Sequence, residues 1–110
     1  MISSTQGWAF VSPLSLVEMK VRLDASSSRA WVVGDSHFNG DYLGCRVEAD
    51  MVVRIYDTGS LSYVANLQYY SLDDDVISAN ARIERSESTL LEHFLPLVGA
   101  ANVLPTTPIE

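Results

Sequence analysis

Residues 43–55 read LGCRVEADMVVRI, and this stretch carries the clearest pattern in the chain. Its odd-numbered positions, from Leu43 to Ile55, are all apolar, whereas the even-numbered ones are glycine or charged except at Val52. Successive side chains of a strand point to opposite faces, so the alternation predicts a β-strand with one dry and one wet face. Its thirteen residues exceed the usual strand length of about 3–10. We therefore expect a bend, a bulge, or two strands across a corner.

The same alternation continues on both sides of this stretch. Residues 57–60 (DTGS) form a predicted turn, and residues 61–70 alternate again, which predicts a hairpin with the preceding strand. Residues 17–24 (VEMKVRLD) alternate apolar and charged throughout and are predicted to be a strand. Shorter strands are expected at 30–33 and at 8–11, the latter ended by Pro13.

The last third of the chain predicts one helix and an extended tail. Residues 77–84 alternate and favour a strand, although a helix over 76–87 is the competing interpretation. The TLLE sequence that begins at Thr89 has a capping-box pattern, and the apolar residues after it predict a helix that Pro96 kinks or ends. Gly99 fits the helix end, and the tail beyond it contains prolines and apolar residues.

The predicted fold class is α+β and mostly β. We expect an antiparallel meander of six or seven strands, forming a curved sheet or a small open barrel, with one C-terminal helix. Residues 1–99 are predicted to be a single β-rich domain closed by that helix, and residues 100–110 an extended apolar tail that packs against something.

Composition and charge narrow the function. The chain has 110 residues, 47% of them hydrophobic, with a single cysteine, which excludes a disordered chain and a disulfide scaffold. Its formal net charge is −7, and residues 56–110 carry most of it, with 2 bases and 8 acids. Such a chain repels phosphate backbones and anionic lipid, so neither a nucleic acid nor a membrane is an expected partner. The single cysteine, the absence of a signal-like start and the short apolar runs predict a cytoplasmic protein.

The loop over residues 34–41 is the most polar segment and a candidate ligand site. Its candidate residues are Asp35, His37, Asn39 and Asp41. A calcium loop would need an oxygen ligand at the position of His37 and a bidentate glutamate at Arg46, so no metal is expected. Neighbouring residues on one loop do not converge as a catalytic triad, and we predict no catalytic residues and no cofactor.

Two further groups are candidate partner-binding residues. Tyr56 and Tyr70 fall on the polar phase of their strands, as Val52 and Val64 do, which predicts an apolar stripe on the outer sheet face. The alternative is that the sheet curls and buries them, or that the tail covers them. Asp73, Asp74 and Asp75 form the densest charge run, which is a solvated turn, a cap, or an acidic knob for a basic partner.

The expected function is that of a small, acidic, non-enzymatic protein-interaction domain. We expect an assembly subunit or accessory protein that self-associates as a homo-oligomer. One alternative is an acidic inhibitor or immunity-type protein that binds a basic cleft through Asp73–Asp75. The other is a pocket protein whose curved sheet holds a small ligand.

Overall fold

The protein folds as one open antiparallel sheet with helices on one face. The computed structural model describes residues 2–26, 29–36, 40–72 and 75–109. Within these residues the elements are β1 (Ile2–Val11), α1 (Leu16–Ser26), β2 (Val32–Ser36), β3 (Gly40–Glu48), β4 (Met51–Gly59), β5 (Ser62–Ser71), α2 (Val76–Thr89), the π-helical turn η1 (Leu90–Phe94), α3 (Leu95–Leu97) and β6 (Ala101–Thr106). The strand order is β2-β3-β4-β5-β1-β6, with every pair antiparallel. The predicted fold class is therefore confirmed.

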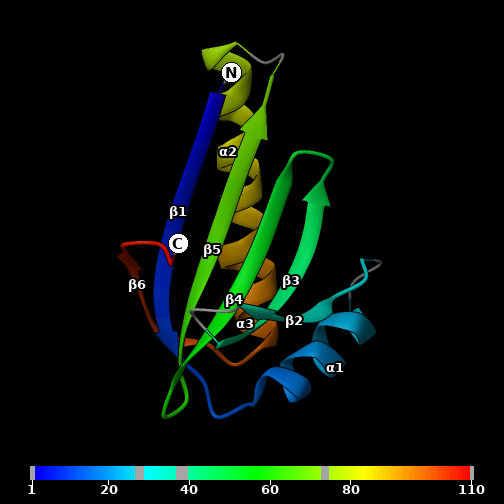
Figure 1. Ribbon diagram of the computed structural model, residues 1–110, viewed down its shortest axis with the longest axis vertical. Helices are drawn as coiled ribbons and strands as arrows, with labels where there is room; N and C mark the ends of the chain where they lie inside the picture. Colours follow the sequence, from blue (N-terminus) through cyan, green and yellow to red (C-terminus); the bar gives the residue numbers. More distant parts are fainter. Residues whose placement is uncertain (1, 27–28, 37–39, 73–74, 110) are drawn as a thin grey trace.

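The helices cover only one face of the sheet. In Figure 1, α2 runs behind the sheet along the length of β5, and α1 lies across the lower end. Apolar side chains from the inward phase of the strands meet both helices and form the main core. Its most completely buried members include Met19, Leu23, Leu43, Val53, Ile55, Ala65, Leu90 and Val98.

The stretch at 43–55 is two strands and not one. It forms the end of β3 and most of β4, which reverse at Ala49–Asp50 and pair directly, with Cys45 opposite Val53. The register shifts between Arg46 and Glu48, so that the bulge turns Glu48 toward the helix side with Met51. The hairpin of β4 with β5 is also confirmed.

Residues 17–24, predicted as a strand, belong to helix α1, so that prediction is wrong. Ser15 accepts a hydrogen bond from the backbone N–H of Glu18 (3.2 Å), and the Glu18 carboxylate accepts one from the N–H of Ser15 (3.1 Å). This reciprocal pair is a capping box that starts the helix. Leu16, Met19 and Leu23 are buried at spacings of three and four residues, whereas Val17 and Val21 face outward.

Residues 77–84 are also helical, so the competing interpretation is correct there. Asp75 caps α2 by accepting a hydrogen bond from the N–H of Ser78 at 2.7 Å. The buried positions Ala79 and Ser86 are small, which lets the helix approach the sheet closely. The helix predicted to begin after Ser88 is the continuation of this one.

Pro96 was expected to kink or end the helix. It instead changes the hydrogen bonding of the turn that precedes it, and the helix continues to Leu97. Proline has no N–H, and its ring clashes with the carbonyl four residues earlier in an α-helix. The N–H of Leu95 donates to the carbonyl of Leu90, which widens the preceding turn into the π-helical turn η1. The helix then stops at Gly99, which adopts a φ of +69°.

The tail adds a sixth strand. Residues 101–106 form β6, which pairs with β1 at the edge of the sheet, and every residue of β6 is exposed. Among the described helices, none is long and apolar enough to cross a membrane.

Candidate functional site: the helix-free face of the sheet

The helix-free face differs in charge from the rest of this acidic chain. Residues directly opposite in an antiparallel pair point to the same face, so the register identifies its members. On the four central strands they include Ser3, Thr5, Gly7, Ala9, Tyr42, Gly44, Arg46, Val52, Arg54, Tyr56, Val64, Asn66, Gln68 and Tyr70. These positions hold two arginines and no carboxylate.

The acids of the β3–β4 turn point to the other side. Glu48 and Asp50 both bind Arg82 of α2, with their nearest oxygens 2.7 and 2.5 Å from its Nη2 atom. That ion pair compensates the charges of both acids, although Asp50 also lines a hollow beside Arg46. The helix-free face is therefore locally basic and aromatic.

Three residues form an aromatic and cationic cluster on this face. Tyr42 lies directly opposite Tyr56, with ring centroids 5.4 Å apart. The guanidinium carbon of Arg54 is 5.3 Å from the centre of the Tyr42 ring, a cation–π contact. The Tyr42 ring extends over Gly34, where a Cβ would lie only 2.4 Å from the ring's Cζ atom. The cluster thus covers the sheet from β2 to β4 and leaves Tyr56 buried.

The C-terminal tail crosses the same face. The side-chain amide of Asn66 donates to the carbonyl of Ile109 at 2.5 Å, and the N–H of Ile109 donates to the Asn66 carbonyl oxygen at 3.2 Å. Asn66 is 5% exposed, so this pair satisfies both halves of a buried amide. The Asn66 side chain thus bonds both the N–H and the carbonyl of an extended segment, as the backbone of a neighbouring strand would.

Gly7 makes room for the tail on β1. A Cβ at residue 7 would lie 2.8 Å from Cα of Pro108 and 3.0 Å from the carbonyl oxygen of Thr106. Only glycine therefore permits the tail to pass this close. Between the tail and the sheet lies a cavity of about 290 Å³, whose lining includes Arg54, Tyr56 and Ile109. We call Gly7, Asn66 and this cavity the tail groove.

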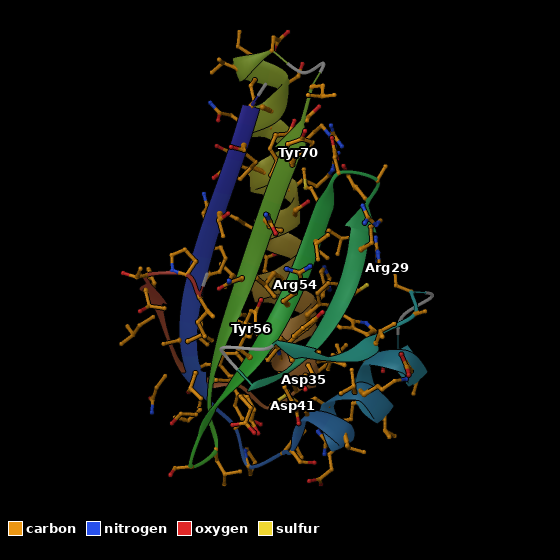
Figure 2. The ribbon with its side chains drawn as sticks, viewed as in Figure 1. Arg29, Asp35, Asp41, Arg54, Tyr56 and Tyr70 are labelled. Atoms are coloured by element: carbon orange, nitrogen blue, oxygen red, sulfur yellow. The ribbon has the colours of Figure 1, made fainter. Side chains whose placement is uncertain are left out.

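The two predicted tyrosines do lie on this face but are not brought together. Tyr56 is opposite Val64, and Tyr70 is six residues further along β5, opposite Asp50. At about 3.3 Å per residue the two are roughly 20 Å apart, and Figure 2 shows Tyr70 near the upper end of the sheet and Tyr56 well below it. Tyr70 is 49% exposed beside Arg46 and Leu72, whereas Tyr56 is buried. They do not form one continuous stripe.

The other predicted site residues are separated by the fold. Asp35 and Asp41 are direct cross-strand neighbours on β2 and β3, and both are exposed. His37 and Asn39 lie outside the described residues, as do Asp73 and Asp74. Asp75 serves as the cap of α2. Within the described part of the chain, no group of three or more His, Cys, Asp or Glu side chains is arranged to hold a metal ion.

The sequence analysis missed the residues of the tail groove. One signal was available for Asn66, because asparagine is a poor strand former and here it sits in the middle of β5. Its partner Ile109 is 43 positions away, a separation that no local pattern encodes. Gly7 offered only the general hint that a glycine within a strand marks a close backbone approach.

Comparison with known proteins adds no assignment. No protein-family model matches the chain, and no curated protein sequence matches it. The function is therefore argued from the geometry alone.

Proposed function

We propose that this chain is a non-enzymatic protein-interaction domain that self-associates by exchanging its C-terminal tail between copies. The observation that carries the proposal is the reciprocal hydrogen-bonded pair between Asn66 and the backbone of Ile109. A second copy can supply the same segment to the same groove, so each contact made within one chain can be remade between two.

The connection to the tail favours exchange. Only three residues, Val98 to Ala100, join α3 to β6, and Gly99 there has a positive φ. Asn102, just inside β6, has a φ of +56°, a left-handed conformation that costs energy for a residue with a side chain. Short strained hinges promote domain swapping, because opening the hinge relieves the strain.

Hydrogen bonds in the tail groove also favour its occupation by a tail. If the tail left, water would replace both backbone partners of the Asn66 amide, so each of these hydrogen bonds contributes a net of about 0.5–1.5 kcal/mol to holding the tail. In contrast, β6 itself is exposed along its whole length and is held mainly by its pairing with β1. The tail is thus anchored at its far end and joined by a strained hinge, an arrangement suited to exchange.

Tail exchange is tested by measuring mass against concentration. Light scattering or sedimentation from the micromolar to the millimolar range is expected to show a dimer that grows with concentration. Inserting Gly-Ser-Gly-Ser between Ala100 and Ala101 lengthens the hinge without removing a groove contact, and is expected to weaken the dimer about tenfold or more. Asn66→Ala is expected to weaken it as well.

A peptide with the sequence of the tail provides an independent test of tail exchange. A fluorescein-labelled ANVLPTTPI peptide, which is residues 101–109, is expected to bind the full chain in competition with its own tail, and to lose binding to Asn66→Ala. A chain that stays monomeric throughout and does not bind this peptide would refute the proposal. A dimer unaffected by both the hinge insertion and Asn66→Ala would refute tail exchange as its mechanism.

The free edge of β2 is a second candidate for self-association. Among the described strands, β2 pairs with β3 alone, and Val32 and Val33 on it are 63% and 45% exposed. An exposed apolar edge can pair with the same edge of another copy. A dimer formed this way would be weakened by Val33→Lys and would be insensitive to the hinge insertion, so the two variants distinguish the candidates.

A further inference from the structure

The cavity of the tail groove combines a polar floor with an apolar cover. Its volume is about 290 Å³, and the tail contributes Pro108 and Ile109 to its lining. The polar lining residues come from the sheet and are Thr5, Arg54, Tyr56, Asn66 and Gln68. A few polar groups set against apolar ones are typical of small-molecule sites, whose volumes begin at about 300 Å³.

The strand register brings these polar side chains to one place. Arg54 of β4 lies directly opposite Asn66 of β5. Gln68, in the next row on β5, lies opposite Thr5 of β1. Tyr56 follows Arg54 by two residues on the same face of β4 (Figure 2). Side chains in the same or neighbouring rows of one face lie about 5–8 Å apart, so one small molecule can contact several of them.

Two hydrogen-bond donors at this cavity are not used within the described fold. Tyr56 is only 5% exposed, and its ring contacts that of Tyr42, but no described residue forms a hydrogen bond with its hydroxyl. The Arg54 guanidinium contacts the Tyr42 ring and forms no ion pair with a described carboxylate. Buried tyrosine hydroxyls usually have a hydrogen-bond partner. A ligand with an acceptor group would serve both donors.

The charge of the cavity limits the kind of ligand. Arg54 is the only cation among the described lining residues, which include no carboxylate. One guanidinium compensates one negative charge, and the chain's net charge of −7 opposes a multiply charged anion. The planar fork of an arginine matches a carboxylate with two parallel hydrogen bonds. The side chains of Pro108 and Ile109 favour an apolar group attached to that carboxylate.

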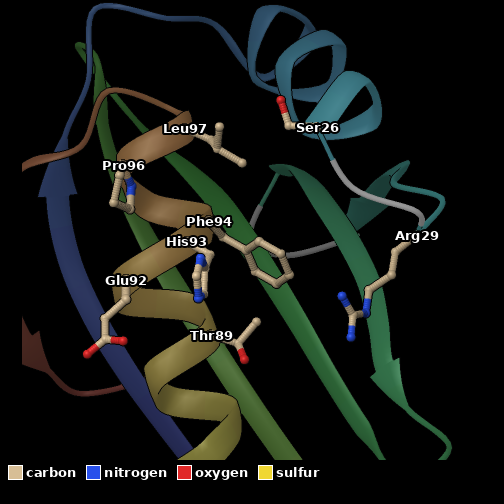
Figure 3. A pocket seen from close by; sticks show the side chains of 8 residues that line it. All are labelled: Ser26, Arg29, Thr89, Glu92, His93, Phe94, Pro96 and Leu97. Atoms are coloured by element: carbon tan, nitrogen blue, oxygen red, sulfur yellow. The ribbon is translucent and has the colours of Figure 1, made fainter.

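The larger pocket at the end of α1 lacks this convergence. It has a volume of about 750 Å³ and lies between Ser26 and the turn η1 (Figure 3). Figure 3 shows Ser26, Arg29 and Glu92 on different sides of it, with the Glu92 carboxylate directed away from Arg29. In the tail groove the polar side chains come instead from directly paired strands. The smaller cavity is therefore the better candidate for a ligand site.

We propose that the cavity of the tail groove binds a small monocarboxylate with a short apolar group. The carboxylate contacts the Arg54 guanidinium and the Tyr56 hydroxyl, and the apolar group lies under Pro108 and Ile109. The tail is part of this site because it supplies the cover. The site requires a tail in the groove, from the same chain or from a second copy, and does not rest on exchange itself.

Sodium benzoate is the probe, and ¹⁵N–¹H NMR of the full chain follows its binding. The side-chain N–H signals of Arg54, Asn66 and Gln68 are expected to shift and to saturate. Arg54→Gln is expected to weaken binding about tenfold, and Tyr56→Phe, which keeps the ring, about fivefold. The matched control is Arg46→Gln, which should weaken binding less than twofold, because Arg46 lies on the same face but outside the cavity lining. The backbone spectrum of each variant checks that the fold is retained.

Uncharged and inorganic ligands test the chemistry of the site. Benzamide, the uncharged isostere of benzoate, should produce no saturable shift, and inorganic phosphate should bind more weakly than benzoate. Equal weakening by Arg54→Gln and Arg46→Gln would overturn the proposal. So would saturable binding of benzamide, tighter binding of phosphate, or an absence of shifts with benzoate.

The hinge insertion after Ala100 separates this test from that of tail exchange. The insertion leaves the groove contacts intact, so benzoate should bind within about twofold of its wild-type affinity even where the dimer is weakened. A chain that stays monomeric and binds benzoate would refute tail exchange alone. A tail-exchanged dimer that does not bind benzoate would refute the carboxylate site alone.

Discussion

Arg82 of α2 donates to one carboxylate oxygen of Glu48 from two of its nitrogens, Nε at 3.1 Å and Nη2 at 2.7 Å. The same guanidinium binds Asp50 and lies over the ring of Tyr69 at 5.5 Å. The helix is thereby joined to the β3–β4 turn. This connection also pairs both carboxylates with a cation of the helix.

Removing that guanidinium should destabilise the fold. Arg82→Met keeps most of the apolar stem but leaves Glu48 and Asp50 without their shared partner. Hydrogen bonds to partly buried charged groups are worth more than exposed ion pairs, so we expect a loss of about 1–3 kcal/mol in the free energy of unfolding. Urea denaturation at neutral pH measures it. The control is Arg85→Met, because Arg85 makes one exposed bond to Glu48 and its loss should cost less than about 1 kcal/mol.

Glu48 gives this connection a defined pH dependence. The hydrogen bond from Arg82, followed by that from Arg85, holds the pKa of Glu48 below its ordinary value of 4.5. Its stabilising contribution is therefore complete above about pH 4.5 and is lost as the pH falls through the lower, folded-state pKa. Glu48→Gln should have a lower free energy of unfolding than the wild type at pH 7, and this difference should shrink as the pH falls. A difference that stays constant from pH 7 to pH 3 would contradict this assignment.

The effect of Glu87 on stability should depend on pH in the opposite direction. Burial, and then the negative charge of Glu84 three residues earlier, raise the pKa of Glu87 above 4.5. Ionised Glu87 thus destabilises the folded state at neutral pH, and protonation relieves this as the pH falls through the raised pKa. Glu87→Gln is expected to raise the free energy of unfolding at pH 7 by about 0.5 kcal/mol. The gain should disappear near pH 4, and a gain of equal size at both pH values would point to a cause other than ionisation.

The sequence predicted the β4–β5 hairpin but not the reversal between β3 and β4, and it predicted the helices poorly, for a physical reason. A period of two includes every spacing of four residues, so the alternation from Val17 to Asp24 satisfies a helix as well as a strand. The buried set at Leu16, Met19 and Leu23 separates the two, but burial is a property of the folded chain; the one local signal for a helix was the capping-box spacing of Ser15 and Glu18. The β4–β5 hairpin was predictable because its turn contains Gly59, whereas the β3–β4 turn at Ala49–Asp50 has no glycine to mark it.

The site was less predictable than the fold. The phase of the alternation placed Tyr56 and Tyr70 on the correct face, yet their separation along the sheet depends on a strand register that the sequence does not show. The tail groove joins Gly7, Asn66 and Ile109, which come from three distant parts of the chain. Such contacts arise from the strand order, in which β1 lies between β5 and β6.

The cap of α1 tests why this helix forms. Ser15→Ala removes the side-chain acceptor for the N–H of Glu18, and the loss of an N-cap costs about 0.5–2 kcal/mol. The Glu18 carboxylate keeps its hydrogen bond from the Ser15 N–H, the largest cause of its lowered pKa, and loses only the smaller contribution of the Ser15 hydroxyl. Thermal unfolding followed by circular dichroism should show a reduced Tm. Ser88→Ala, at an exposed position inside α2, should leave Tm unchanged or slightly raised, since alanine is the better helix former.

Gly7→Ala isolates the passage of the tail across β1. The added Cβ would meet the backbone of Pro108 at 2.8 Å, and backbone atoms cannot rotate away as a side-chain end can, so the tail must lift. The N–H of Ile109, bound to the carbonyl oxygen of Asn66 in the wild type, should then exchange with solvent much faster. Hydrogen–deuterium exchange with mass spectrometry measures this, and Ser3→Ala on the same face of β1 is the control. Because the added Cβ blocks the groove to the tail of either copy, Gly7→Ala should abolish the dimer too. A dimer that persisted although the tail was released would show that self-association does not use the groove.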